Sequence, residues 1–152
     1  MSWKLPWEGG CRCNKLRFRI TTEPLLTAAC HCAGCQKMSA SAFSLSIAVA
    51  KGGFAVTAGE WVIGGLHDPK ALHHMCKHCL SWVFTDPVDF GIINFRATML
   101  DDHAWFRPYV DMNAAEKLPW AQTGAPRNYD KQPSMEELGP LCAEFAEKGA
   151  RP

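Results

Sequence analysis

The sequence has no long hydrophobic run. Its most apolar stretch, around residues 43–50, is interrupted by two serines and is far shorter than the about 20 residues that cross a bilayer. The first eight residues also lack the apolar segment of a secretory signal. These absences predict a cytoplasmic protein without a membrane partner. In that reducing compartment, clustered cysteines are more often metal ligands or catalytic groups than disulfides.

An excess of charge of one sign is also missing. The 16 Lys and Arg residues are balanced by 15 Asp and Glu, which leaves a formal net charge of +1. This balance gives no electrostatic footprint for nucleic acid, so no nucleic-acid partner is expected. With 47% hydrophobic and 20% charged residues, the composition is that of a folded globular protein and excludes general disorder. The length predicts one domain over residues 1–152.

Internal repeats are absent, and so are long runs of helical periodicity before residue 130. Residues 14–22 alternate strictly, with Leu16, Phe18 and Ile20 on one face. Residues 43–49 repeat this pattern, with Ser44 and Ser46 on the face opposite to the apolar residues. Period-two alternation predicts half-buried strands, and short strands at regular spacing predict a mainly antiparallel β domain. Further strands are expected over residues 54–57, 60–63, 82–85 and 91–97.

The C-terminal region differs from the rest of the chain. Ser134 followed by Glu137 resembles a capping box, and apolar residues recur at helical spacing as Leu138, Leu141, Cys142 and Phe145. Pro140 lies too deep for one uninterrupted helix from Ser134. We therefore expect either two helical turns that meet at Gly139 and Pro140, or a main helix with Pro140 in its first position. Residues 123–133 are expected to form a surface loop.

Cysteine, in contrast, is abundant. Seven of the eight cysteines form three groups, namely Cys11-Arg12-Cys13, Cys30-His31-Cys32-Ala33-Gly34-Cys35 and Cys76-Lys77-His78-Cys79. In an extended C-x-C the two side chains share one face, and the turn of a C-x-x-C brings two sulfurs close enough to share a metal. Soft thiolates select zinc or iron–sulfur clusters over magnesium or calcium. The eighth, Cys142, lies on the apolar stripe and is expected to be a buried small hydrophobe.

Seven ligands are an odd number for four-coordinate sites. The economical interpretation is one closed site of four sulfurs and one open site of three, and an open position distinguishes catalytic from structural zinc. Spacing alone does not decide which groups combine, although the middle group can supply three ligands by itself. Disulfides, a redox C-x-x-C and an iron–sulfur cluster are the competing interpretations.

The three cysteine groups occur in order within a longer framework of motifs. The framework comprises residues 10–13 leading into the alternating strand, then residues 30–36, 41–43, 54–60, 76–79 and 118–120. In this framework the chain resembles the glutathione-dependent formaldehyde-activating enzyme family, which includes centromere protein V. The resemblance covers about residues 7–121 and leaves residues 122–152 as a C-terminal loop and helical extension.

The resemblance implies a zinc-braced β-tent fold with two zinc ions per chain. It implies a structural zinc held by Cys11, Cys13, Cys76 and Cys79, and a catalytic zinc held by Cys30, Cys32 and Cys35. The family reaction is the condensation of glutathione with formaldehyde to S-hydroxymethylglutathione, which is a carbon–sulfur lyase activity in reverse. The implied partners are therefore a small thiol and a small aldehyde.

An open site of three thiolates suits this chemistry. Coordination to zinc deprotonates a thiol, so a substrate thiol in the vacant position would be held as thiolate. Ser41 is the expected polar contact in the substrate pocket, and Trp120 is expected at the pocket rim. His31 lies between two ligands, and on an extended segment its ring points away from the metal, which favours a structural role. No catalytic residue is predicted beyond this open site.

The sequence departs from the family pattern at residues 39–40, 80–82 and 109–112. None of these residues is an expected metal ligand, so the departures leave the zinc prediction intact and the actual thiol and electrophile open. The alternative function is a non-catalytic zinc module that binds a protein partner, which the balanced charge and the lack of a basic extension disfavour. A guanine-exchange chaperone is a third interpretation, and it would require only the structural zinc.

Overall fold

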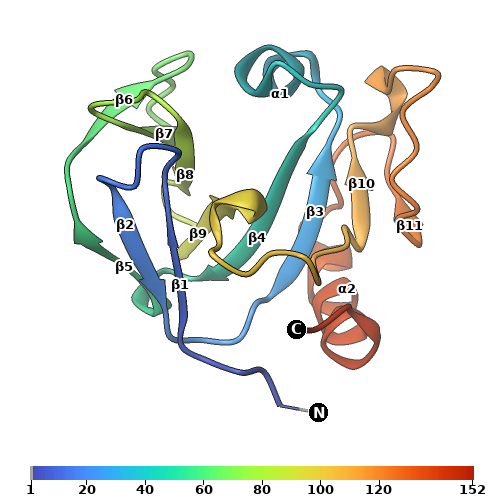
Figure 1. Cartoon of the computed structure of the whole chain (residues 1–152). Coiled ribbons are helices and arrows are strands. Elements are labelled where there is room, and N and C mark those ends of the chain that lie inside the picture. Colours follow the sequence, from blue (N-terminus) through green and yellow to red (C-terminus); the bar gives the residue numbers. More distant parts are fainter. Residues whose placement is uncertain (1) are drawn as a thin grey trace.

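Short strands in two sheets dominate the computed structural model, which describes residues 2–152 (Figure 1). The smaller sheet has the order β1-β2-β5, with β1 at Trp7–Gly10, β2 at Arg17–Ile20 and β5 at Phe54–Ala58. The larger sheet has the order β11-β10-β3-β4-β9-β8-β7-β6. Its strands are β3 (Leu26–Cys30), β4 (Ser44–Ala50), β6 (Trp61–Gly64), β7 (Ala71–Cys76), β8 (Trp82–Pro87), β9 (Ile92–Arg96), β10 (Val110–Met112) and β11 (Arg127–Asn128).

The predicted mainly β fold class is confirmed, and most neighbouring strands are antiparallel. The exception is β10, which pairs in parallel with both β3 and β11. A parallel pair cannot be joined by a tight hairpin and needs a long connection, and the chain between β3 and β10 contains most of the larger sheet. The pairing of β10 with β3 therefore brings residues 110–112 against the strand that ends at Cys30.

The core lies between the inner faces of the two sheets. The alternating residues of β2 are buried as predicted, and Phe18 packs on Phe54 at 5.3 Å and on Phe95 at 5.5 Å between ring centroids. Gly9 on β1 lies so close to this contact that a Cβ would come within 2.4 Å of the Phe18 ring and 2.5 Å of the Met99 carbonyl oxygen. Glycine at this position thus permits the smaller sheet to close over the core just before the first cysteine pair.

The six strands expected from the sequence, two of them from alternation, are found as β2, β4, β5, β6, β8 and β9. One expectation about β4 is wrong, because Ser44 is buried like the apolar residues of the strand rather than exposed on the opposite face. Strand β4 pairs with β3 on one side and β9 on the other, and α1 (Ala33–Ser39) lies over its beginning (Figure 1). A central strand that is covered on both faces has no solvent face for its polar residues.

The C-terminal helix α2 runs without interruption from Met135 to Lys148, so both expected arrangements around Pro140 are wrong. Its capping box is complete, since Ser134 Oγ accepts from the Glu137 N–H and the Glu137 carboxylate accepts from the Ser134 N–H. Leu141 and Phe145 are buried while Pro140 is exposed. Proline has no N–H, so one carbonyl of the preceding turn loses its donor, and water can satisfy this carbonyl on the exposed side of the helix. The packing of the buried face outweighs the remaining cost of the proline.

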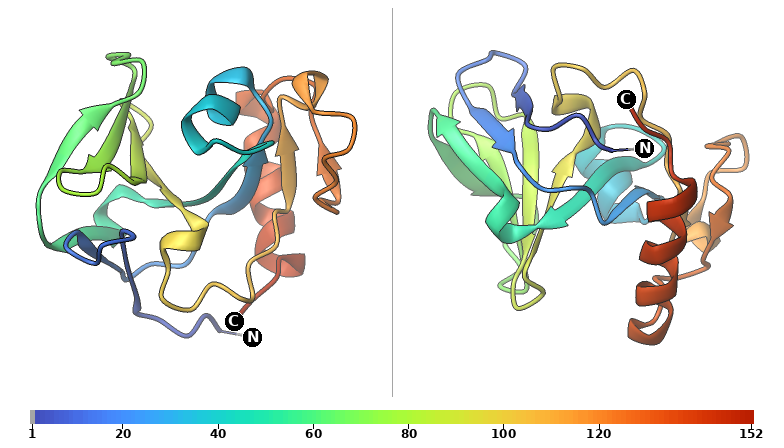
Figure 2. Two further views of the ribbon diagram at one scale, coloured as in Figure 1. Left: turned by 45° about the horizontal axis from the view of Figure 1, so that its top comes forward. Right: turned by 90° about the horizontal axis from the view of Figure 1, so that it is seen from below.

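Helix α2 lies beside the start of the chain, and the two ends come near each other in both views of Figure 2. Phe145 stacks on Trp3 with ring centroids 6.0 Å apart, and Trp3 in turn packs edge-on against Trp7 at 5.6 Å. None of the helices within residues 2–152 combines the length and apolar character needed to cross a membrane.

Candidate metal centres and substrate pocket

One cluster joins the first and third cysteine groups. The Sγ atoms of Cys11, Cys13, Cys76 and Cys79 all lie within 4.8 Å of one another. Two of these side chains follow β1 directly, and the other two come from the end of β7 and the turn into β8. The cluster therefore connects the smaller sheet to the larger one, and its members Cys13 and Cys76 are 63 positions apart in the sequence.

The spacing of these sulfurs fits a tetrahedral metal. Zinc bonds of about 2.3 Å place tetrahedral sulfurs about 3.8 Å apart, and the sulfurs are separated by 3.4 Å for Cys11–Cys13 and 3.8 Å for Cys13–Cys76. The Leu16 N–H donates to Cys11 Sγ at 3.3 Å, and Cys79 Sγ lies 3.3 Å from Ser81 Oγ. Such hydrogen bonds stabilise thiolates, so the donor set is compatible with zinc.

A second cluster comprises Cys30, Cys32 and Cys35, whose Sγ atoms also lie within 4.8 Å of one another. Cys30 ends β3, Cys32 is the N-cap of α1, and Cys35 lies in the first turn of that helix. The Cys32 sulfur accepts a hydrogen bond from the Cys35 N–H at 3.3 Å. Within residues 2–152 no further His, Cys, Asp or Glu completes this group. Three soft donors with one position open are compatible with a zinc that can take an exogenous ligand.

The protein surroundings stabilise a thiolate at Cys30. A hydrogen bond from the Cys35 thiol lowers the pKa of Cys30 to about 5, aided by the backbone of Cys32 and by the Asn113 side chain. The Asn113 amide donates to Cys30 Sγ at 3.2 Å. The pKa of Cys35 is raised, because this thiol supplies the hydrogen bond to Cys30 and is itself buried. These hydrogen bonds favour the thiolate form of Cys30.

A buried polar network lies next to the second cluster. The His31 ring is fully buried, as expected for a structural role, and its Nε2 lies 3.0 Å from a carboxylate oxygen of Asp111 on β10. Asp111 also accepts hydrogen bonds from Thr123 at 2.7 Å and Lys117 at 3.1 Å. Burial raises the pKa of Asp111, but the hydrogen bonds from His31, Thr123 and Lys117 outweigh this effect and lower it. The network fixes β10 against the Cys30–Cys32 segment.

Two adjoining cavities lie beside α1. The first, of about 570 Å³, is lined by both expected substrate residues, Ser41 and Trp120, together with Gln36, Lys37 and Leu118. The indole of Trp120 is 72% exposed, which places it at the surface of this cavity. The second cavity, of about 430 Å³, shares Ser41 and reaches Arg96 and the residues after Cys79, namely Leu80, Ser81 and Trp82. These volumes match those of small-molecule sites.

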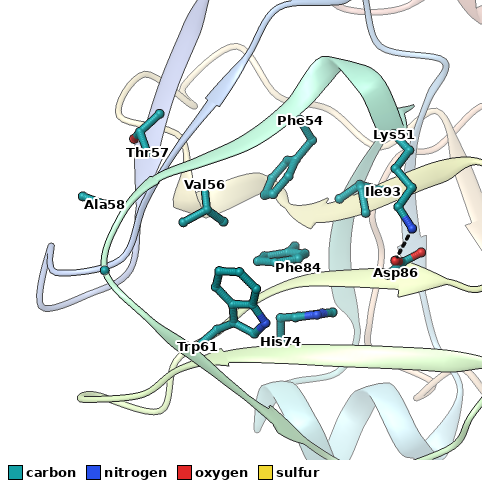
Figure 3. A pocket seen from close by; sticks show the side chains of 11 residues that line it. Lys51, Phe54, Val56, Thr57, Ala58, Trp61, His74, Phe84, Asp86 and Ile93 are labelled. Atoms are coloured by element: carbon teal, nitrogen blue, oxygen red, sulfur yellow. Dashed lines mark hydrogen bonds and ion pairs between the residues drawn. The ribbon is translucent and has the colours of Figure 1, made fainter.

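A third cavity, of about 520 Å³, lies between β5 and the β6–β8 hairpins (Figure 3). His74 and Phe84 stack there with ring centroids 4.2 Å apart, and Lys51 pairs with Asp86 at its edge. None of the seven clustered cysteines lines any of the three cavities, but the first two are lined by residues next to Cys35, namely Gln36, Ser39 and Ser44, and the third is not. Its aromatic walls continue into the core contacts of Phe54, so the cavity is an opening between the sheets rather than part of either cysteine site.

Three polar residues beside the second cluster were missed by the sequence analysis, namely Arg96, Asp111 and Asn113. Asp111 lies in the segment 109–112, which was noted only as a departure from the family pattern. Asn113 carries a positive φ of 54°, a conformation that Asn tolerates better than most residues. No local motif marks any of the three, because each reaches the cluster through sheet pairing.

The chain is similar to known proteins in sequence and in fold. The sequence profile of the family described as "glutathione-dependent formaldehyde-activating enzyme" matches residues 6–115, which is more than two thirds of the chain. The Leu118–Pro119–Trp120 segment lies outside the matched range. A search of curated proteins gave no match. Among solved structures, a Rhodobacter sphaeroides protein determined by structural genomics is similar with a TM-score of 0.52 and 15% identity, over 62% of this chain and 87% of the other. That similarity supports the fold alone.

Proposed function

Because the chain belongs to the glutathione-dependent formaldehyde-activating enzyme family, we propose that it is a zinc-dependent enzyme of the carbon–sulfur lyase type. In this proposal it adds a small thiol, glutathione or a similar compound, to a small aldehyde such as formaldehyde, or catalyses the reverse. The observation that carries the proposal is the three-cysteine cluster with an open position, next to two cavities of small-molecule size. A purely structural module would not need such a site.

In this proposal the two clusters have different functions. Cys11, Cys13, Cys76 and Cys79 would hold a structural zinc, and Cys30, Cys32 and Cys35 would hold a catalytic zinc. When bound there, zinc supplies a position that keeps a thiol as thiolate at neutral pH. The remaining tasks belong to the chain itself. Asn113 orients the Cys30 sulfur through its hydrogen bond, and Ser41 and Trp120 line the space in which the substrate would lie.

The rigid surroundings of the second cluster support a catalytic assignment. His31 is held from β10 by Asp111, which has three side-chain partners. Buried polar networks restrict side-chain positions, and reactions between two bound molecules gain their rate from such positioning. The contacts of Asp111 would thus help to keep the segment from Cys30 to Cys32 in place.

The test combines metal content with reaction rate. We expect the purified protein to contain two zinc ions per chain by mass spectrometry, and Cys30→Ser to contain one. We expect the wild type to accelerate the exchange between glutathione and its formaldehyde adduct, measured by NMR, and Cys30→Ser to lose this acceleration. Cys142→Ser is the matched control, because Cys142 belongs to neither cluster, and it should keep both zinc ions and the rate.

Two outcomes would contradict the proposal. If Cys30→Ser retained the exchange rate, the second cluster would not be catalytic. If the wild type held only one zinc and gave no acceleration with glutathione and formaldehyde, the alternative of a non-catalytic zinc module that binds a protein partner would take precedence.

A further inference from the structure

Arg96 at the end of β9 is an unusually buried cation. The residue is only 9% exposed, and its guanidinium lies over the Trp82 ring with Cζ 3.9 Å from the centroid. One Nη2–H donates to the Asn94 carbonyl at 3.2 Å. Burial lowers the pKa of Arg96 to about 10, so the guanidinium still carries its charge at neutral pH.

This cation forms no ion pair with an Asp or Glu side chain of residues 2–152. Its Nε is buried without a hydrogen-bond partner. A buried charge without a paired carboxylate is unfavourable because it has lost its hydration. A ligand of opposite charge would supply the missing partner.

Arg96 lines the cavity of about 430 Å³ that adjoins the three-cysteine cluster. The connection to the cluster runs through Ser44, which lines the same cavity and whose side chain hydrogen-bonds to the Cys35 sulfur. Cys35 and Cys30 of the cluster also raise the pKa of Arg96 through electrostatic attraction, which places the cluster near the guanidinium. A molecule in this cavity can therefore contact both Arg96 and Ser44, and Ser44 is the residue that joins the cavity wall to the cysteine cluster.

We propose that Arg96 binds a carboxylate of the thiol substrate in this cavity, so that the enzyme selects small thiols that carry a carboxylate over neutral thiols. The inference rests on the proposed function and specifies its substrate class. A guanidinium matches a carboxylate in shape and charge and forms charge-assisted hydrogen bonds with it. Trp82 supports the planar guanidinium from below, which reduces the entropy lost when the carboxylate binds.

Zinc bound to three thiolates would itself carry one negative charge, and this charge is the competing explanation for Arg96. The two explanations differ in what the cation recognises. If Arg96 only balances the charge of the metal site, replacing it changes the zinc content and the affinity for all ligands equally. If Arg96 binds a carboxylate, replacing it changes only the affinity for ligands with a free carboxylate.

The experiment measures ligand binding by calorimetry on the zinc-loaded protein, using S-methylglutathione and its diethyl ester as probes. Neither has a free thiol, so their binding does not depend on thiolate chemistry. We expect Arg96→Gln to weaken S-methylglutathione binding by about 10- to 100-fold, to leave the diester affinity within about twofold, and to retain both zinc ions. Arg19→Gln, an exposed arginine on β2 paired with Glu8, is the matched control and should change neither affinity.

Arg96→Lys provides a second variant in case the Gln variant does not fold. It keeps the charge but lacks the planar donor fork, and we expect it to weaken S-methylglutathione binding by about 10-fold with the diester unaffected. The inference is overturned if the wild type does not bind S-methylglutathione, if the Arg96 variants leave its affinity unchanged, or if they weaken both probes equally or lose zinc.

These outcomes are separable from the proposed function. Binding of S-methylglutathione that depends on Arg96, without acceleration of the glutathione–formaldehyde exchange, would support the carboxylate site and reject the lyase activity. Acceleration by the wild type, with affinities that do not depend on Arg96, would support the activity and reject the carboxylate site.

Discussion

The two cysteine clusters use the same donor atoms and are built in opposite ways. The four-cysteine cluster draws its sulfurs from two segments far apart in the sequence and joins the two sheets. The three-cysteine cluster comes from one contiguous segment at the junction of β3 and α1, and a metal there closes no long loop. Loop closure contributes to stability roughly with the logarithm of loop length. A metal in the first cluster would therefore stabilise the fold, and one in the second would contribute little to it.

The residues that surround the two clusters also differ. The first makes short-range hydrogen bonds with Leu16 and Ser81. The second has the Asp111 network behind it and two cavities beside it. This contrast teaches that the number of thiolates alone does not separate a structural site from a reactive one. A reactive site is distinguished from a structural one by the residues and cavities that surround a cluster in which a fourth ligand is missing.

The largest expected effect is the loss of stability from Cys76→Ser. Cys76 is 1% exposed, and its removal breaks the connection between the sheets. Because loss of a structural metal belongs to the most damaging class of substitutions, we expect the free energy of unfolding to fall by more than about 4 kcal/mol. Thermal denaturation followed by circular dichroism measures this change, with Cys142→Ser as the control. An unchanged midpoint would contradict the structural role of the first cluster.

The same substitution in the second cluster should give the reverse pattern. For Cys30→Ser we expect the exchange rate of glutathione with its formaldehyde adduct to fall by more than about 100-fold. Loss of a metal ligand should lower the rate more than loss of a residue that hydrogen-bonds to a ligand. The free energy of unfolding should change by less than about 1 kcal/mol. A loss of stability as large as that of Cys76→Ser would remove the distinction between the clusters.

An intermediate effect is expected from Asn113→Gly. Glycine keeps the positive φ of this position but removes the amide that donates to Cys30 Sγ. We expect zinc to bind the second cluster about 10-fold more weakly, measured by competition with a chelator, while the first cluster keeps its affinity. Asn128→Gly on the exposed strand β11 serves as the control. Equal weakening of both clusters would show a general effect on folding.

The smallest effect on the clusters is expected from Thr123→Val, which removes the hydroxyl that donates to Asp111 at 2.7 Å. The same hydroxyl accepts a hydrogen bond from the Ala125 N–H at 3.1 Å, and at about 1 kcal/mol for each of the two bonds the free energy of unfolding should fall by about 2 kcal/mol. Because the lowered pKa of Asp111 contributes stability above the carboxyl's unfolded pKa, and this contribution is lost as the pH falls through the folded-state pKa, the variant should also unfold at a higher pH on acidification. Urea titrations over a pH series, with the exposed Thr21→Val as reference, measure both changes.

Much of the fold could be predicted from local patterns. The alternation at Leu16, Phe18 and Ile20 predicted β2 and its buried face, because side chains of a strand alternate between faces. The same rule misplaced Ser44, since it assumes that one face meets water. It also gave no signal for β10, whose three residues become a strand only by pairing with β3.

The C-terminal helix shows a different limit of sequence reasoning. The capping box at Ser134 correctly marked where the helix begins, while the proline rule wrongly divided it at Pro140. Intrinsic propensities compete with tertiary packing, and the burial of Leu141 and Phe145 against the core favours the continuous helix. Neither the sequence spacing nor the propensity of Pro140 contains that packing energy.

For the candidate site, the sequence by itself determined the donors. It carries seven thiols in three groups, an order of motifs shared with one enzyme family, and a buried stripe for each strand that alternates. Only the tertiary structure decided which polar groups surround those donors, namely Asp111 and Asn113 behind the open cluster and Arg96 beside it. The physical reason is the separation in sequence between the residues that interact. Ligand spacing within a C-x-x-C depends on one turn of backbone. The contacts of Asp111 and Asn113 depend on the pairing of β10 with β3 across 82 positions, and the placement of Arg96 depends on the pairing of β9 with β4 across 50 positions.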